Sequence, residues 1–317
     1  MQGTQLSLNS KRPWTVRFRL SLPLLLIFTP VLIWFIIFCY VPMYGVVIAF
    51  KDFKGWEGIV SFFTKDDWVG LKWFNDFFSS IYFWRLFKNT ILLNIYNLLW
   101  SFPIPILFAL LLNEVRNRLF KRTVQTVSYL PYFISTVVVI GMVVNFLSPS
   151  DGIINRGLLA IGLVEKPIHF INSPEWFRTI YITSGIWQTF GYSSIIYLAA
   201  LSGVNPELYE AAEVDGAGRF RKAMHISIPG IMPTIIILLL LALGSMMSIG
   251  FEKVLLLQKP ITFETSDVIA TYVYRVGIKE ARFGIATAVG FFNSVINIIL
   301  LVFFNAVSRR VSDTSLW

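Results

Sequence analysis

Residues 205–230 read NPELYEAAEVDGAGRFRKAMHISIPG, a polar and charged stretch punctuated by glycine. It lies between two apolar stretches, ITSGIWQTFGYSSIIYLAAL at 182–201 and IMPTIIILLLLALGSMMSIG at 231–250. A helix needs roughly 20 such residues to cross a hydrocarbon core about 30 Å thick, so both stretches are long enough to cross a bilayer. The polar stretch is therefore predicted to be a loop outside the lipid, and the side of the membrane on which it lies decides what it contacts.

The composition indicates a membrane protein. Of 317 residues, 56% are hydrophobic and only 14% are charged, whereas a soluble domain carries about 25% charged residues. The single cysteine, Cys39, and the two histidines, His169 and His225, exclude a disulfide framework and argue against a Cys/His metal site. A net charge of +9 is typical of the basic residues that orient membrane proteins, and no nucleic-acid partner is expected.

Six long apolar stretches predict an all-α, polytopic membrane protein with six transmembrane helices. The first is preceded by Lys11, Arg12, Arg17 and Arg19, as in a signal peptide, but its apolar run is too long and no A-x-A cleavage site follows. It is therefore expected to be a retained anchor. The six predicted spans are about 20–41, 86–112, 123–147, 179–202, 230–250 and 284–307.

The distribution of Lys and Arg predicts the orientation of these spans. The segments 1–19, 113–122, 203–229 and 308–317 carry thirteen Lys and Arg against six Asp and Glu. The opposite segments 42–85, 148–178 and 251–283 carry thirteen against twelve, over a greater length. Basic loops remain in the cytoplasm, so both termini and the loop 205–229 are predicted to be cytoplasmic.

Segment 42–85 is rich in Trp, Phe and Tyr, which favour the headgroup region of a bilayer. It is predicted to be an external interfacial segment. The alternative is that this segment only covers the outer end of the helix bundle and binds no ligand. The predicted division of the chain is then a cytoplasmic tail 1–19, a first helix 20–41, this segment, a transmembrane domain 86–307 and a cytoplasmic tail 308–317.

The absence of several catalytic and transport motifs excludes some classes of function. There is no G-x-x-x-x-G-K-[ST] nucleotide loop, no G-x-S-x-G and no H-E-x-x-H, so we expect neither an enzyme nor a chain that binds a cofactor or metal itself. No Asp or Glu lies in the centre of a predicted span, which argues against a proton- or sodium-coupled carrier. No TVGYG filter or Arg-periodic voltage sensor supports a channel.

The predicted spans instead carry uncharged polar and aromatic side chains, which suit a polyhydroxylated neutral solute. Its hydroxyl groups need donors and acceptors, and its ring faces stack on Trp or Tyr. The alternative, which stays open, is that these groups hydrogen-bond neighbouring helices. The residues proposed for a substrate path are Asn97, Asn145, Trp187, Gln188, Tyr192, Ser245 and Asn293.

The loop 205–229 is predicted to fold as two short helices. Asn205 is a good N-cap, Pro206 suits the first helical position, and Gly216 is a typical C-terminal cap. A second helix is expected from about Ala217 to Ile226, with Pro229 at the entry to the next span. This polar helix-turn-helix is suited to docking another protein at the membrane surface.

Within this loop, residues 210–229 match the EAA-x3-G-x9-I-x-L-P motif and so resemble the permeases of ABC importers. Ile228 stands where the motif has Leu, which is an apolar exchange. The resemblance implies that the loop is the coupling helix seated in a cleft of an ATPase subunit, where Glu210 meets a basic residue and Gly216 permits the tight turn. The predicted coupling residues are Glu210, Ala211, Ala212, Gly216, Arg219, Ile226 and Pro229.

Further stretches, among them YVPMYGVVIAFKDF, YLPYFISTVVV and FGIATAVGFFNSVINIILL, are similar to carbohydrate importers of the polysaccharide and lipoprotein-associated permease group. The resemblance covers nearly all of 20–307 and implies a type I permease core with an added first helix. It implies a second permease, two ATPase subunits that bind ATP and Mg, an extracellular solute-binding lipoprotein and an oligosaccharide substrate. The alternatives are an importer of glycerol phosphate or peptide, or a secondary carrier or channel.

Overall fold

The computed structural model describes residues 14–54, 67–311 and 315. Within these residues the fold is helical, and the only strand-like pairing is one isolated bridge between Lys51 and Trp68. The all-α class is therefore confirmed. Parts of the predicted tails (1–13, 312–314, 316–317) and of the aromatic outer segment (55–66) lie outside the described residues.

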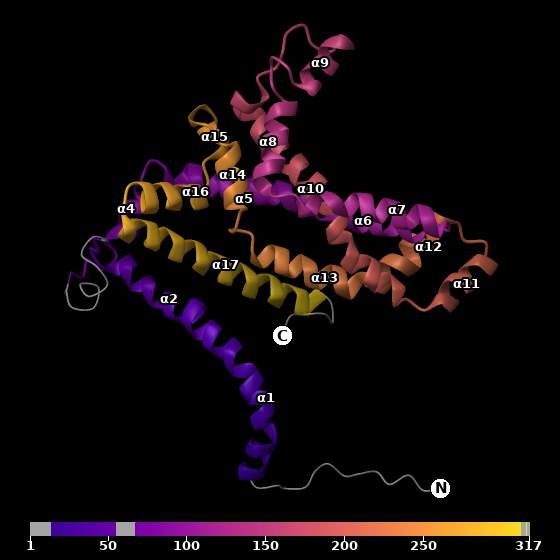
Figure 1. The fold of residues 1–317 in the computed structure, drawn as a ribbon, viewed down its shortest axis with the longest axis horizontal. Coiled ribbons are helices and arrows are strands. Elements are labelled where there is room, and N and C mark those ends of the chain that lie inside the picture. Colours follow the sequence, from indigo (N-terminus) through magenta and orange to yellow (C-terminus); the bar gives the residue numbers. More distant parts are fainter. Residues whose placement is uncertain (1–13, 55–66, 312–314, 316–317) are drawn as a thin grey trace.

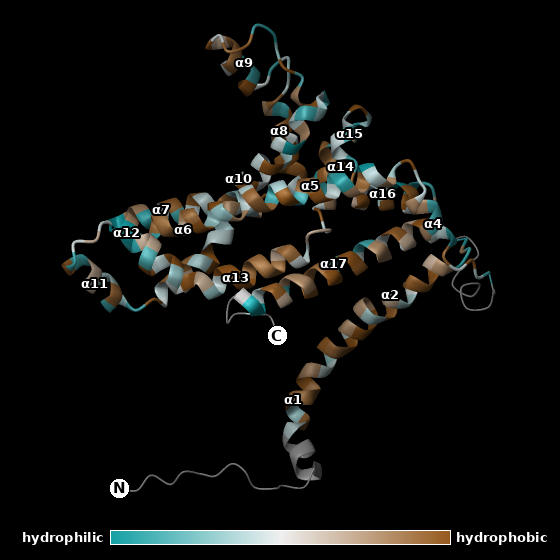
Figure 2. Ribbon diagram, turned by 180° about the vertical axis from the view of Figure 1, so that it is seen from behind, coloured by the Kyte–Doolittle hydropathy of each residue, from teal (hydrophilic) through white to brown (hydrophobic). Residues whose placement is uncertain are grey.

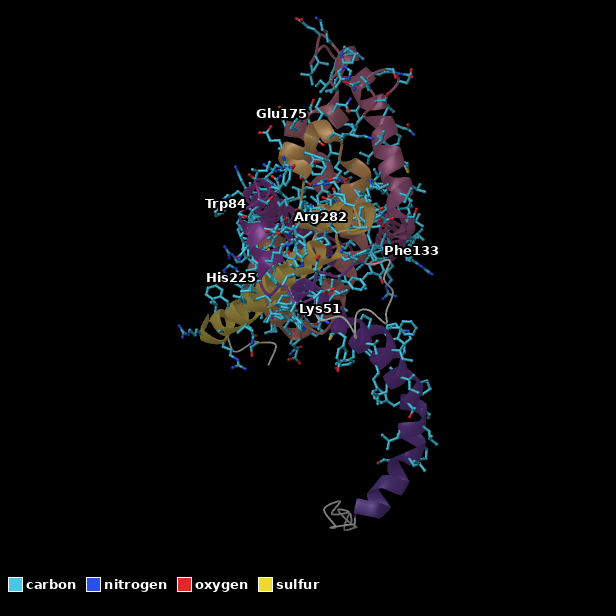
Figure 3. All side chains as sticks on the ribbon, turned by 90° about the vertical axis from the view of Figure 1, so that its left-hand side faces the viewer. Lys51, Trp84, Phe133, Glu175, His225 and Arg282 are labelled. Atoms are coloured by element: carbon cyan, nitrogen blue, oxygen red, sulfur yellow. The ribbon has the colours of Figure 1, made fainter. Side chains whose placement is uncertain are left out.

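The N-terminal helix stands apart from the rest of the chain (Figures 1 and 3). Its apolar stretch Ser21–Phe50 covers residues 21–41 of the predicted first span, and none of its most apolar window is buried. Only its end returns to the body, where the ring of Phe50 lies 5.5 Å from Phe74 and 6.3 Å from Phe291. The helix runs through α1 (Trp14–Phe35), η1 (Ile36–Tyr40), α2 (Val41–Met43) and η2 (Tyr44–Phe50).

Three further stretches are long and apolar enough to cross a membrane, and they coincide with predicted spans. The first joins α5 (Phe83–Ser101) to α6 (Pro103–Asn113). The second ends in α13 (Ile228–Gly244), and the third lies in α17 (Phe283–Val311). In Figure 2 hydrophobic residues follow α13 and α17, which lie side by side in both ribbon views.

The predicted span 123–147 is not one straight helix. Two helical segments, Arg118–Phe133 and Thr136–Phe146, meet at an angle of 98°. Ile134 adopts an extended conformation after the 3-10 turn that contains Pro131, and the Ser135 hydroxyl then caps the next helix at the Val138 amide. These local signals end one helix and start another. The elements are α7 (Arg118–Tyr129), η4 (Leu130–Phe133) and α8 (Thr136–Phe146).

The predicted span 179–202 lies in α10 (Pro174–Ser202), which is as long as α17 but is not among the helices that are apolar enough to cross a membrane on composition alone. It carries polar and aromatic side chains over much of its length and packs against α5, α6, α7 and α13. Gly191 permits one of these contacts, because a Cβ there would collide with the backbone of Ser128 in α7. Six spans and cytoplasmic termini therefore remain predictions.

The buried side chains form three clusters between these helices. One joins α10 to α8 and α14 around Ile180 and Val254, and one joins α5, α16 and α17 around Leu86 and Val289. The third joins α6, α10 and α13 around Leu201 and Ile231. Shorter elements complete the fold: α4 (Lys72–Phe78), α9 (Ile153–Ala160), η5 (Phe170–Asn172), α11 (Pro206–Val214), α12 (Arg219–Lys222), η6 (Ala223–Ser227), α14 (Phe251–Leu257), η7 (Pro260–Thr262), α15 (Phe263–Ser266), α16 (Ile269–Tyr274) and η8 (Arg275–Lys279).

Candidate functional site

The loop quoted first folds as α11, a tight turn and α12. The Asn205 side chain accepts a hydrogen bond from the Glu207 amide at 3.0 Å, which satisfies a free donor at the helix start. Gly216 has φ = +73°, a left-handed conformation in which residues with a Cβ are strained. The Ala217 amide then donates to the Ala212 carbonyl at 2.8 Å, which closes the end of α11.

The second helix of this loop differs from the prediction in its extent. It begins at Arg219 with Gly218 as its N-cap, and it does not end before the next span. The helix is continuous from Arg219 to Gly244, with a π-helical segment at 223–227 between α12 and α13. Pro229 lies at the start of α13, two residues after the π-helical segment. The predicted helix-turn-helix is thus a short helix, a turn and a second helix that continues into a predicted span.

The predicted coupling residues are mostly accessible. Glu210, Ala211 and Gly216 are exposed, and Ala212 is half-buried. α11 buries none of its side chains. Of the remaining predicted residues, Arg219 and Pro229 are exposed and Ile226 is half-buried. The loop therefore presents a free surface to a partner, with an acidic residue at its centre.

A pocket of about 520 Å³ lies between α5, η4, α10 and α13. Its polar side chains are one amide, aliphatic hydroxyls and phenols, and two predicted substrate-path residues, Asn97 and Tyr192, line it. It also contains groups that the sequence analysis did not single out. They include Ser101 from α5, Tyr132 from η4 and Thr189 from α10.

Aromatic rings form one wall of this pocket. The rings of Tyr132 and Tyr192 are stacked, with centroids 3.8 Å apart and planes at 3°. Phe133 meets Tyr192 edge-on at 6.0 Å and is itself largely exposed. The break between α7 and α8 positions Tyr132 and Phe133, because η4 turns both rings toward α10.

The other predicted substrate-path residues lie elsewhere. The Gln188 amide donates to the Ile134 carbonyl at 3.0 Å, where it satisfies the backbone at the bend. Trp187 lines a separate, mostly apolar pocket of about 560 Å³ between α8 and α10. Ser245 bonds the carbonyl groups of its own helix, and Asn145 is exposed on α8. Asn293 is half-buried in α17, and its Oδ1 atom has no hydrogen-bond partner.

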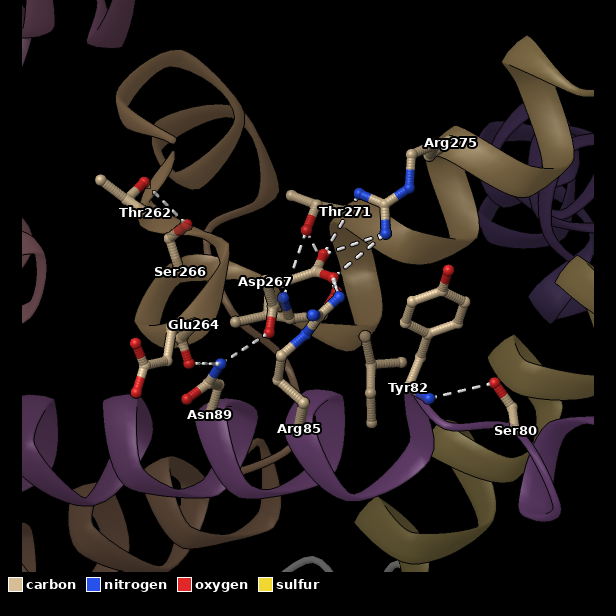
Figure 4. Close-up of polar contacts among 12 residues, drawn as sticks. Ser80, Tyr82, Arg85, Asn89, Thr262, Glu264, Ser266, Asp267, Thr271 and Arg275 are labelled. Carbon is tan, nitrogen blue, oxygen red and sulfur yellow. Dashed lines mark hydrogen bonds and ion pairs between the residues drawn. The ribbon is translucent and has the colours of Figure 1, made fainter. Parts of the chain in front are cut away.

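A buried charge cluster joins residues of the predicted external segments 42–85 and 251–283 and was not singled out from the sequence (Figure 4). The Asp267 carboxylate is fully buried and pairs with Arg85 at 2.7 Å and Arg275 at 3.1 Å. Asn89 donates to the Asp267 carbonyl at 3.1 Å and accepts from Arg178 at 3.0 Å. These contacts join α5, α10 and the segment between α15 and η8. The sequence did not single out Asp267, because its partner Arg85 lies 182 positions away in the chain.

Lys253, on α14, is a second buried charge outside the predicted spans. Its ammonium donates to the Tyr181 carbonyl at 2.6 Å and lies 4.6 Å from the centroid of the Tyr181 ring. Burial lowers the pKa of Lys253 to about 8. No cluster of three or more His, Cys, Asp or Glu side chains that could hold a metal ion occurs in the described part of the chain.

Comparison with known families decides the class of the protein. Residues 101–313 match the model of the binding-protein-dependent transport system inner membrane component. The chain belongs to this family. This inner membrane component is a permease subunit of an ABC importer and crosses the membrane several times, and ATP hydrolysis belongs to a separate subunit.

Curated relatives of this permease extend over nearly its whole length. Protein LplB of Bacillus subtilis (strain 168) is 41% identical over 304 residues, which cover 96% of this chain and 94% of that protein. The polygalacturonan/rhamnogalacturonan transport system permease protein YteP of the same organism is 42% identical over 294 residues, which cover 93% of this chain and 90% of that protein. The predicted membership of the ABC importer permeases is therefore confirmed.

Solved structures show the same fold. A chain of a bacterial ABC transporter involved in the import of the acidic polysaccharide alginate has a TM-score of 0.86 and 45% identity, over 95% of this permease and 99% of that chain. A chain of the bacterial alginate ABC transporter in complex with an alginate pentasaccharide-bound periplasmic protein has a TM-score of 0.87 and 44% identity, over 96% and 100%. The type I permease fold is thus confirmed.

Proposed function

We propose that this permease forms half of the translocation pathway for an oligosaccharide released from a polysaccharide. YteP, named for polygalacturonan and rhamnogalacturonan, and the alginate transporter support a polysaccharide-derived substrate. The pocket between α5, η4, α10 and α13 supports a sugar substrate in general, because a stacked pair of tyrosines, one amide and several hydroxyls suit sugar rings and their hydroxyl groups.

The complete transporter in this proposal contains a second, non-identical permease and two ATPase subunits that bind ATP and Mg. An extracellular solute-binding protein delivers the oligosaccharide, as the complex of the alginate transporter with a periplasmic protein suggests. The permease itself binds no nucleotide. ATP-driven motion must then enter it through a surface that contacts the ATPase.

The observation that carries this proposal is the exposed helix α11. None of its side chains is fully buried, Glu210 lies on its surface, and the left-handed Gly216 ends it in a tight turn. Such a polar, capped helix leaves most of its surface free for a partner. It is suited to a cleft of the ATPase, where a basic group meets Glu210 and Ala211 allows close approach.

The experiment is purification of the assembled transporter from cells that express all of its subunits. The Glu210→Lys variant is expected to insert with the second permease but to lose the ATPase or its stimulation by substrate-loaded binding protein. If the charge pair is desolvated, the loss corresponds to about 2–5 kcal/mol of binding free energy. The matched control is Glu175→Gln, an exposed acidic residue at the other end of the adjoining helix α10. Full ATPase binding and stimulation in Glu210→Lys would contradict the proposal.

A further inference from the structure

α11 is separated from the body of the permease by a cavity of about 660 Å³. The cavity lies between α11, α12 and the ends of α6 and α10, and its lining includes Asn113, Ser202, Tyr209 and Glu213. In Figure 1 α11 lies at the edge of the molecule, beyond the ends of α6 and α7. Because α11 has no buried side chain, apolar packing does not fix its position.

Two polar contacts bridge α11 to the helix that follows it. The Lys222 ammonium lies 2.7 Å from the Glu213 carboxylate, and the Tyr209 hydroxyl lies 2.9 Å from the Ser227 hydroxyl. The Lys222 side chain is 11% exposed and Ser227 is 1% exposed, so both contacts are anchored in the body of the chain. The hydrogen bond and charge of Lys222 lower the pKa of Glu213.

Both anchors belong to the continuous helix 219–244, which reaches the pocket. Ile231 of this helix is buried against Leu201 of α10. Eleven residues after Ser227, Leu238 lines the pocket between α5, η4, α10 and α13, and so does Ala242. A continuous helix can pass a displacement along its axis, so a movement of α11 that reaches Lys222 and Ser227 also shifts this wall of the pocket.

We infer that the Glu213–Lys222 and Tyr209–Ser227 contacts are a brace that makes α11 move with α13. The four residues are positioning residues for coupling, distinct from Glu210, which faces the ATPase. Without the brace, α11 stays joined to the body through the backbone at 203–205 and the turn at 215–218. An ATPase that displaced it would then rotate α11 without moving α13. This inference rests on the proposed function.

The test uses the assembled transporter in lipid vesicles, with its ATPase and its substrate-loaded binding protein. Lys222→Met and Glu213→Gln are expected to keep the ATPase bound and its basal hydrolysis unchanged. Stimulation of ATP hydrolysis by the loaded binding protein should fall about fivefold or more, the lower range of typical allosteric coupling. The exchanged pair Glu213→Lys with Lys222→Glu restores the contact with reversed polarity and is expected to recover the stimulation. Tyr209→Phe removes the second contact without loss of volume and should act in the same direction.

Arg221→Met is the matched control, because it removes one positive charge from α12 at an exposed position next to Lys222. It is expected to behave as the unmodified transporter. Full stimulation in Lys222→Met, Glu213→Gln and Tyr209→Phe would overturn the brace. Loss of ATPase binding in the single variants without recovery in the exchanged pair would also overturn it, since these residues would then contact the ATPase directly. Failure of the unmodified permease to bind any ATPase would instead contradict the proposed function.

Discussion

The guanidinium of Arg85 lies 2.7 Å from the carboxylate of Asp267, although 182 positions separate the two residues. Asp267 is fully buried and also accepts from Arg275. A buried carboxylate is stable only when its charge is compensated by close partners. The pair therefore ties α5 to the segment between α15 and α16, which follows the predicted fifth span.

Asp267→Ala is expected to destabilise the permease by about 1–3 kcal/mol, because it leaves two partly exposed arginines without their buried counter-charge. The measurement is thermal unfolding of the purified transporter, together with its yield. Asp76→Asn is the control, since Asp76 is exposed on α4. Equal unfolding temperatures for Asp267→Ala and the unmodified protein would show that the cluster is not needed for stability.

Two residues of α10 that lie one turn apart, Tyr192 and Gln188, are expected to affect different properties of the permease when they are changed. Tyr192→Ala and Tyr132→Ala remove the stacked rings from the pocket and should reduce oligosaccharide uptake severalfold, with assembly and basal ATP hydrolysis near normal. Gln188→Ala instead removes the donor to the Ile134 carbonyl and should lower the thermal stability of the permease. Uptake by vesicles and unfolding temperature distinguish the two effects. Unchanged uptake in both tyrosine variants would exclude this pocket from the substrate path.

Gly216 predicts a conformational effect at the coupling loop. A residue with a Cβ in the left-handed region costs about 1–2 kcal/mol, and a β-branched one is strained further. Gly216→Ala should therefore weaken substrate-stimulated ATP hydrolysis, and Gly216→Val should abolish it. A Cβ at Gly216 would meet no neighbouring atom, so the effect is one of backbone conformation alone. Gly157→Ala, in open space without a positive φ, is the control and should have no effect.

Lys253 predicts a pH dependence of stability. Its pKa of about 8 lies below the value of about 10.4 in an unfolded chain, so the unfolded state binds more protons between these two values. The destabilisation by the buried charge is complete below pH 8 and is relieved as the pH rises toward 10. Relative to Lys253→Met, the unmodified permease should gain stability over this interval. A constant difference in unfolding temperature from pH 7 to pH 10 would contradict the assignment.

The predicted orientation has a direct test in reporter fusions. Fusions after Arg122 and Arg219 should report the cytoplasm, and fusions after Lys65 and Lys166 should report the outside. The asymmetry of Lys and Arg between the two sets of loops is the physical reason. Lys65 lies outside the described residues, so Lys166 provides the external fusion at a described position. An external signal at Arg219 would contradict the assignment of α11 to the cytoplasm.

Local signals explain which features could be predicted. Asn205 caps the amide of Glu207 two residues away, and Gly216 ends α11 within the same loop, so both were readable from neighbouring residues. The bend after Pro131 was also encoded locally, by a proline followed by the capping Ser135. Within an unbroken apolar run, however, these residues did not stand out from a straight span.

The sequence by itself determined the class of the protein, its apolar helices and the capped loop that contains α11, because apolar length and capping depend on residues close together in the chain. Only the tertiary structure decided which polar side chains meet. In the tertiary structure Tyr132 of η4 stacks on Tyr192 of α10, and the Gln188 side chain donates a hydrogen bond to the Ile134 carbonyl at the bend. Arg85 pairs with Asp267. The physical reason is that a hydrogen bond or ion pair requires its atoms within about 3 Å, and packing of distant helices sets that distance.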